Sequence, residues 1–215
     1  MDHFVITGTG RSGTRYAAEL FTRLGLPCSH QRVFSDSYNL SGWKLGWDGK
    51  IGDSSAFAAP FVDTLPETTL IIHQVRDPRL VINSMIEHQH VPGQRAKSDK
   101  GLRFLERHVP RVMSIEGLPA RAARFWTEWN LKIEKARDRS NYLFHRLEDY
   151  SPTFLEKIFD VFETPLDRAF AEGVLRVQSK TTGGTGKTLP VNIADIDDPE
   201  FHEMVTRYGY RKAST

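Results

Sequence analysis

The first apolar run of the chain leads into a glycine-rich loop and then into a helical pattern. Residues 3–7 (His-Phe-Val-Ile-Thr) predict a short strand, and residues 8–13 (Gly-Thr-Gly-Arg-Ser-Gly) follow it directly. Large apolar side chains then recur every four residues from Tyr16 to Leu24, which predicts a helix that ends at Gly25. A strand, a glycine loop and a helix in this order open an α/β fold with a parallel sheet.

The same alternation of apolar strands and amphipathic helices continues along the chain. Asp77 and Pro78 supply the cap and the first-turn proline of a helix that follows an apolar strand. The other predicted elements are a short strand ending at Asp53, a strand over 69–75, a helix over 119–138, a strand over 142–147 and a helix opened by Ser151-Pro152. This alternation predicts one three-layer α/β/α domain over residues 1–215, P-loop NTPase-like, with a central parallel sheet of about four or five strands.

Two stretches break this pattern. Residues 88–101 are polar and have no helical or strand period, and residues 178–190 are rich in glycine and threonine. Such segments are typical of surface loops. We therefore expect residues 88–118 and 178–190 to form mobile loops or a lid.

The composition excludes several classes of protein. The chain has 215 residues, of which 39% are hydrophobic and 26% charged, as in a globular protein large enough to bury a core. No apolar run reaches the roughly 20 residues of a membrane span, and the start lacks the features of a signal peptide. Cys28 is the single cysteine, so no internal disulfide forms. We expect a cytoplasmic protein without stable membrane insertion.

The charge balance narrows the choice of ligand. A net charge of +2 argues against a nucleic-acid binder, which usually carries a strong basic excess. The small total hides an uneven distribution, because residues 95–147 hold 13 basic and 6 acidic side chains whereas residues 148–172 hold 2 and 7. A small polyanion is compatible with this sequence, since two arginine-bearing loops can bind it without changing the charge of the whole chain.

The loop over residues 8–13 has the composition of an anion site. Backbone N–H groups converge at such a loop, and the N-terminus of the following helix adds partial positive charge. A nucleotide P-loop places Lys and then Ser or Thr after its last glycine, but Thr14 and Arg15 stand there instead. The residues for Mg²⁺-dependent triphosphate chemistry are therefore missing, and Arg11 supplies a basic side chain earlier in the loop. We expect no metal site.

Three motifs together resemble the sulfotransferases that use 3′-phosphoadenosine-5′-phosphosulfate (PAPS). Residues 11–14 (Arg-Ser-Gly-Thr) after a strand are similar to the loop that binds the 5′-phosphosulfate. Arg76, followed by Asp-Pro-Arg and by Ser84 eight residues later, is similar to the pair that holds the 3′-phosphate. Residues 142–150 resemble the family's strand that ends near the adenine, with Leu147 at the position beside the base.

The resemblance covers about residues 3–150 and implies which residues bind PAPS and its product, adenosine 3′,5′-bisphosphate (PAP). Arg76, Ser84 and Leu147 are expected at the nucleoside end. A second glycine-rich run, residues 183–188, resembles the loop that covers the 3′-phosphate and adds Lys187. The residues expected around the phosphosulfate are Gly10, Arg11, Ser12, Gly13, Thr14, Arg15 and Tyr16.

Sulfuryl transfer needs a group that removes the acceptor's proton and a cation beside the leaving phosphate oxygen. Arg11 stands where the family has its Lys or Arg on the bridging oxygen, so it is the expected catalytic cation. The base stays open between two residues. His30 lies 19 residues after Arg11, where related enzymes have a glutamate, and an imidazole suits a general base near neutral pH. Asp53 is the competing carboxylate.

The leading hypothesis is a metal-independent sulfotransferase that moves the sulfuryl group of PAPS to a hydroxyl of a carbohydrate, lipid or small-molecule acceptor. Two alternatives stay open. One is a small-molecule P-loop kinase, which would need a Mg²⁺ ligand, and the other is a degenerate P-loop module that binds a nucleotide without catalysis. The sequence predicts neither the identity of the acceptor nor the oligomeric state.

Overall fold

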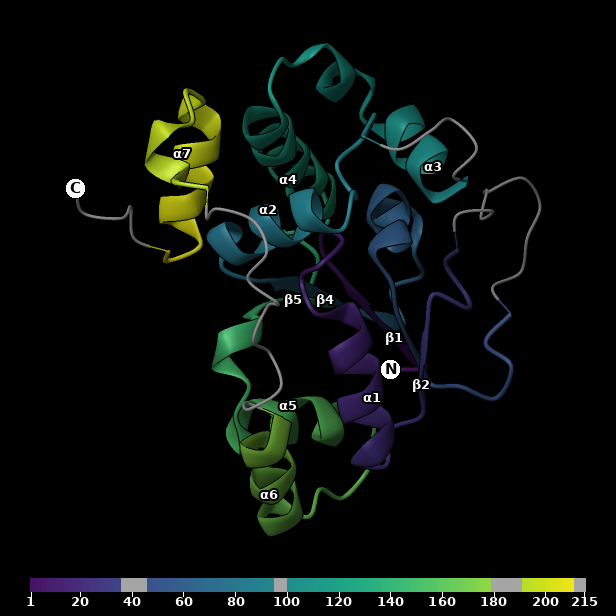
Figure 1. Ribbon diagram of the computed structural model, residues 1–215. Coiled ribbons are helices and arrows are strands. Elements are labelled where there is room, and N and C mark those ends of the chain that lie inside the picture. Colours follow the sequence, from purple (N-terminus) through teal and green to yellow (C-terminus); the bar gives the residue numbers. More distant parts are fainter. Residues whose placement is uncertain (36–45, 95–99, 179–190, 211–215) are drawn as a thin grey trace.

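Five parallel strands form the centre of the molecule (Figure 1). The computed structural model describes residues 1–35, 46–94, 100–178 and 191–210. In chain order the strands are β1 (His3–Thr7), β2 (Cys28–His30), β3 (Gly52–Ser54), β4 (Thr69–Val75) and β5 (Tyr142–Arg146). They lie in the order β2-β3-β1-β4-β5 and every pairing is parallel, which confirms the predicted α/β sheet.

The two central strands, β1 and β4, send alternate side chains into two separate apolar cores. Phe4 and Ile6 pack in one core, and Val5 packs in the other, because successive side chains of a strand point to opposite faces. Ile71 and Ile72 of β4 divide between the same two cores. All five side chains are fully buried. A sheet covered on both faces therefore explains the continuous apolar runs in the sequence.

Each core is covered by its own set of helices. One face, in the lower part of Figure 1, is covered by α1 (Thr14–Arg23), α5 (Pro152–Val161) and α6 (Arg168–Gln178). The other face is covered by the 3-10 helices η1 (Ala56–Thr64) and η2 (Pro110–Ser114) and by α2 (Pro78–Glu87), α3 (Lys100–His108), α4 (Leu118–Glu134) and α7 (Pro199–Arg207). The predicted three-layer α/β/α arrangement is confirmed.

The helix starts predicted from capping residues are also confirmed. Asp77 Oδ1 accepts a hydrogen bond of 2.9 Å from the N–H of Arg79 at the start of α2. Ser151 Oγ accepts one of 3.2 Å from the N–H of Phe154 at the start of α5. Local side-chain chemistry therefore fixes where these two helices begin.

The structure corrects two of the predicted boundaries. Residues 88–118 are not one irregular loop, because they contain α3 and η2. Phe104, Val109 and Val112 of this segment are buried in the core, and this anchoring was hidden by the polar residues around them. The last predicted strand ends at Arg146 rather than 147, since Leu147 opens a short 3-10 helix, η3 (Leu147–Asp149). Residues 179–190 of the other predicted loop lie outside the described residues.

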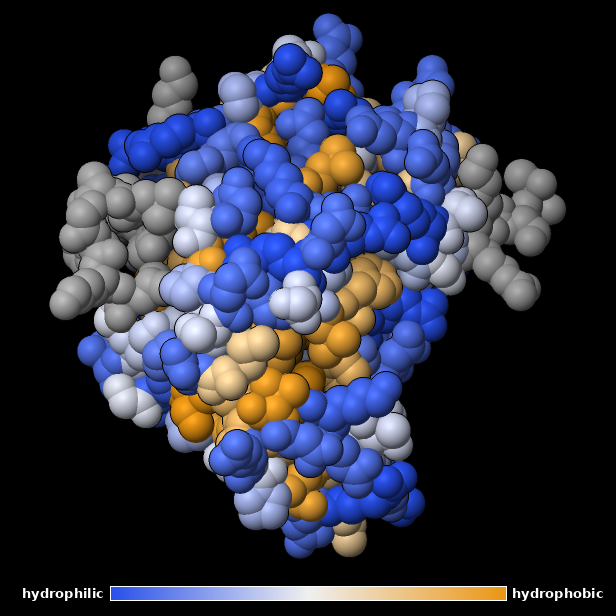
Figure 2. Space-filling model, turned by 180° about the vertical axis from the view of Figure 1, so that it is seen from behind, coloured by the Kyte–Doolittle hydropathy of each residue, from blue (hydrophilic) through white to orange (hydrophobic). Residues whose placement is uncertain are grey.

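Most of the molecular surface seen from behind is hydrophilic (Figure 2). Hydrophobic residues gather in one area of this face, in the lower half of the view. Among the described residues, no helix combines the length and the apolar character that a membrane crossing requires. The apolar side chains that organise the fold are therefore mainly those of the two cores.

Candidate functional site

The connections after β1 and β4 leave the sheet toward opposite faces. The chain runs from β1 into α1 on one face and from β4 into α2 on the other, although the two strands are neighbours. A crevice forms outside the carboxyl ends of the strands where such a reversal occurs, and ligands of α/β sheets bind there. The loop over residues 8–13 and the turn at Arg76 both lie at this point.

Two glycines allow the loop to lie close against its neighbours. A Cβ added at Gly8 would be only 2.0 Å from the carbonyl oxygen of Gln74 on β4. Gly13 has a φ of 93°, and a Cβ there would be 2.8 Å from Cδ2 of Leu147. Gly13 caps α1 without a side-chain hydrogen bond, and the first turn of α1 has no acidic residue. The positive end of this helix is therefore available to an anion.

Three guanidinium groups gather around the loop. Arg11 Nε donates to Ser84 Oγ at 2.8 Å, and Arg76 Nη1 donates to the carbonyl oxygen of Arg11 at 3.4 Å. Burial lowers the pKa of Arg11, and the charges of Arg76 and Arg15 lower it further. Within the described ranges, none of these three arginines forms an ion pair. Such a concentration of positive charge suits a multiply charged anion.

A cavity of about 800 Å³ opens beside these arginines. Seven of the ten described residues expected to bind PAPS line it, namely Gly10, Arg11, Gly13, Thr14, Arg15, Tyr16 and Arg76. Ser12, Ser84 and Leu147 do not line it, and Lys187 lies outside the described residues. The two loops that the sequence motifs singled out therefore meet at one cavity.

The three expected residues that do not line the cavity each contact its lining. Ser84 accepts the hydrogen bond from Arg11, and Leu147 packs its methyl groups over Gly13. Ser12 is fully buried, and its hydroxyl finds no hydrogen-bond partner within the described part of the chain. A buried hydroxyl without a partner is energetically costly, so this atom is suited to receive a ligand oxygen after a small shift of the loop.

His30 brings an imidazole to the cavity from the end of β2. Its Nε2 lies 3.3 Å from Thr14 Oγ1 at the start of α1. Burial lowers the pKa of His30, and the charge of Arg15 adds to this effect. A lowered pKa keeps the ring neutral near pH 7, so that it can accept a proton.

Asp53, the other candidate base, is held away from the cavity. It is fully buried on β3 and does not line the cavity. Its Oδ1 accepts hydrogen bonds from Ser29 Oγ at 2.6 Å and from the N–H of Arg32 at 3.1 Å, while Oδ2 accepts one from the N–H of Phe34 at 3.1 Å. These contacts give Asp53 a structural use, since they tie down the segment on both sides of His30.

Sequence analysis missed one polar residue beneath the loop, Gln74. Its Nε2 donates to the carbonyl oxygen of Ser12 at 2.9 Å, and its Oε1 accepts a hydrogen bond of 2.7 Å from the hydroxyl of Tyr150. Gln74 is fully buried in a strand that is otherwise largely apolar. A glutamine in such a strand must find partners inside the protein, and this was the signal that could have identified it.

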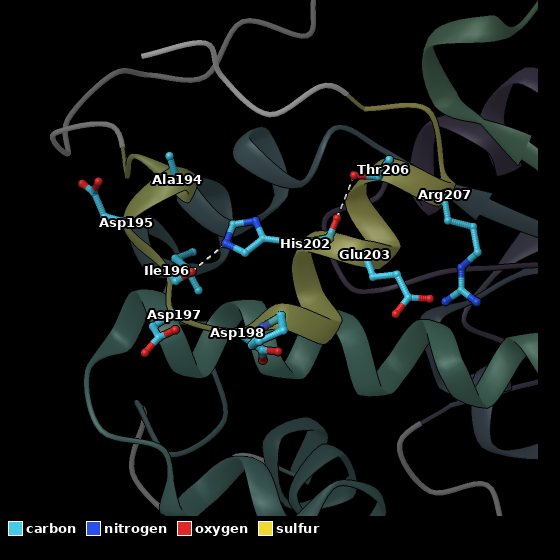
Figure 3. A pocket seen from close by; sticks show the side chains of 10 residues that line it. Ala194, Asp195, Ile196, Asp197, Asp198, His202, Glu203, Thr206 and Arg207 are labelled. Atoms are coloured by element: carbon cyan, nitrogen blue, oxygen red, sulfur yellow. Dashed lines mark hydrogen bonds between the residues drawn. The ribbon is translucent and has the colours of Figure 1, made fainter.

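A second hollow, of about 820 Å³, lies along α7 (Figure 3). Asp195, Asp197 and Asp198 surround the turn before this helix, and Nε2 of His202 lies 2.7 Å from the carbonyl oxygen of Ile196. In the part of the chain that the structure describes, no group of three or more His, Cys, Asp or Glu side chains could hold a metal ion. The hollow therefore offers no chemistry comparable with that of the arginine-lined cavity.

Comparisons with known proteins identify the fold. No protein-family model and no curated protein matches the chain. Among solved structures, the sulfotransferase domain from the curacin biosynthetic pathway matches with a TM-score of 0.58 and 13% identity, over 98% of each chain. Mouse sulfotransferase SULT7A1 complexed with PAP matches with a TM-score of 0.49 and 15% identity, over 93% of this chain and 74% of that one. The chain therefore has the fold of a sulfotransferase domain.

The anchoring contacts of Asp53 lead to a test of its role. Asp53→Asn should lower the free energy of unfolding by about 1–3 kcal/mol, because buried N–H donors lose a charged acceptor. Urea unfolding followed by circular dichroism measures this change. Asp63→Asn, on an exposed aspartate, is the control and should change stability by no more than about 0.5 kcal/mol. An Asp53→Asn protein as stable as its parent would contradict the anchoring role.

Proposed function

We propose that this protein is a sulfotransferase that uses PAPS as the sulfuryl donor and a hydroxyl compound as the acceptor. The observation that carries the proposal is the meeting of two arginine-bearing loops at one cavity, at the switch point of a sheet with the sulfotransferase fold. PAPS carries two anionic clusters separated by a nucleoside. Arg11 and Arg15 would neutralise the 5′-phosphosulfate, and Arg76 would neutralise the 3′-phosphate.

In this proposal the reaction is an in-line transfer between two oxygen atoms. The bond between sulfur and the bridging phosphate oxygen breaks as a bond forms between sulfur and the acceptor oxygen. The acceptor proton passes to the imidazole of His30, whose lowered pKa keeps it neutral beforehand. Arg11 places its positive charge beside the phosphate oxygen that leaves. Preference for His30 over Asp53 rests on position, since only His30 lines the cavity.

A kinase would use different residues at this loop. The lysine and the Mg²⁺-binding hydroxyl of a nucleotide P-loop are replaced by Thr14 and Arg15. Binding of PAP without a metal therefore separates the two reactions, because a P-loop kinase would instead bind ATP with Mg²⁺. A module without catalysis would bind PAP but would transfer no sulfate from PAPS.

The first test measures the binding of PAP by isothermal titration calorimetry in the presence of EDTA. Arg76→Ala should weaken binding by roughly 1.5–3 kcal/mol, because a charge-assisted contact is lost. Arg79→Ala is the matched control, since Arg79 pairs with Asp77 on the same turn and does not line the cavity. Its affinity for PAP should match that of the parent.

Two outcomes of this titration would count against the proposal. If the parent protein fails to bind PAP but binds ATP with Mg²⁺, the kinase alternative replaces it. If the parent binds PAP and Arg76→Ala binds it equally well, Arg76 is removed from the site.

The second test concerns the role of His30 and is read from the pH profile of turnover. His30→Gln should lower kcat by about a hundredfold or more and leave the affinity for PAP within about twofold, because the ring acts only as the base. Since the pKa of His30 is lowered, the parent should keep its full rate down to pH 6.5 and lose it only below that value. The variant should lack this acidic limb. A variant with the same limb as the parent would assign the proton transfer to another group.

A further inference from the structure

The cavity has a second part that the donor does not explain. Its polar lining comes from the loop after β1, the start of α1 and the segment after β2. Its remaining walls come from the opposite core, through η1, α2, α3 and α4. The side chains that these four elements contribute are all apolar, namely Ala56, Phe57, Met85, Leu105 and Phe125.

These walls set the chemistry of a molecule that could lie against them. Met85 and Phe125 are almost fully buried in the core, so this surface is continuous with a packed apolar interior. A sugar placed here would lose the hydration of its hydroxyl groups without gaining partners from these side chains, which is unfavourable. An alkyl or aromatic group would instead be favoured, because it removes apolar surface from water on both sides.

We propose that the acceptor is an apolar alcohol or phenol, bound with its hydrocarbon body against Phe57, Met85, Leu105 and Phe125 and with its hydroxyl toward His30. This inference rests on the proposed function. It selects among the carbohydrate, lipid and small-molecule acceptors that the sequence left open. A purely polar glycan is excluded from the role of preferred acceptor.

The test compares two classes of acceptor with radiolabelled PAPS. 2-Naphthol and 1-octanol are the apolar probes, and methyl β-D-glucoside and chitobiose are the sugar probes. The apolar probes should be sulfated with a higher kcat/KM than either sugar. Leu105→Gln, which places an amide on the apolar wall, should lower kcat/KM for 2-naphthol about tenfold while the affinity for PAP stays unchanged. Leu80→Gln, on a side chain that is 49% exposed and outside the cavity, is the control.

The outcomes separate this inference from the proposed function. If the protein binds PAP but prefers a sugar, or sulfates neither apolar probe, or keeps full activity in Leu105→Gln, the apolar acceptor is overturned and PAPS dependence stands. If the protein does not bind PAP, the proposed function itself fails.

A different observation, the hydrogen bonds of Gln74, supports a second inference about the loop. Gln74 joins β4 to Ser12 through its amide, and Tyr150 fixes which way that amide points. A Cβ added at Gly13 would lie 3.3 Å from Nε2 of Gln74, so the amide fits closely under the loop. Both groups lie beneath the anion-binding loop without lining its cavity.

We infer that Gln74 and Tyr150 form a positioning pair that holds the loop in its anion-binding shape. Without the hydroxyl of Tyr150, the amide of Gln74 is free to turn its oxygen toward the carbonyl of Ser12. Two carbonyl oxygens would then face each other, and the loop would have to move away. The pair therefore affects the affinity for an anion without touching it.

Calorimetric titration with PAP, together with thermal unfolding, tests this pair. Gln74→Met and Tyr150→Phe should each weaken PAP binding, by about tenfold for Gln74→Met. The double variant should bind no more weakly than Gln74→Met alone, because both changes remove the same effect. Tyr142→Phe is the matched control, since its hydroxyl lies 2.7 Å from Nδ1 of His73 on the same strand but away from the loop. It should lose stability and keep its affinity for PAP.

A purely structural role would give a different result. In that case Tyr150→Phe would lower the melting temperature and leave PAP binding unchanged, as Tyr142→Phe does. This result in Tyr150→Phe would overturn the inference even if Gln74→Met failed to fold. A parent protein that does not bind PAP would instead contradict the proposed function.

Discussion

The close approach of Gly8 to the carbonyl oxygen of Gln74 is the constraint on which the cavity depends. No side chain fits between the loop and β4 at this point, since a Cβ would lie 2.0 Å from that oxygen. The loop therefore lies directly on the neighbouring strand. This brings Arg11 within reach of Ser84 on α2 and brings the carbonyl of Arg11 within reach of Arg76. Contacts between segments some seventy residues apart follow from one glycine.

The electrostatic character of the site follows from the same approach. Bringing Arg11, Arg15 and Arg76 together costs free energy, because like charges repel and burial removes water from Arg11. The fold supplies the cost through its two packed cores, which hold both loops in place whether or not an anion is bound. The net charge of +2 gives no hint of this local concentration. Position in the fold, rather than total charge, determines what the site attracts.

Sequence reasoning succeeded where local chemistry determines structure. The strands β1 and β4 are continuous apolar runs, and the starts of α2 and α5 are set by capping side chains, so both were predictable. β2 was not predicted, because it is a strand of three residues (Cys-Ser-His) that exists only through its pairing with β3. α3 was missed since Phe104 is anchored by contacts with distant parts of the chain.

The candidate site shows the same division. The glycine loop and Arg76 carry recognisable motifs, so their meeting at one cavity could be anticipated. The contacts of Asp53 could not, because they depend on the backbone N–H groups of Arg32 and Phe34, about twenty residues away. Gln74 has no motif at all, and its partners come from the loop and from Tyr150 near the end of the resemblance.

The hydrogen bonds that Asp53 accepts have a consequence for the energetics of proton transfer. Ser29 and Arg32 are both fixed to one buried carboxylate, and His30 lies between them along the chain. The backbone that carries the imidazole therefore has little freedom to move when charge develops on the ring. In such a setting the reorganisation energy of the surroundings is small, because the dipoles around the base are already oriented before the reaction begins. A carboxylate that never meets the reactants can in this way lower a barrier from inside the fold.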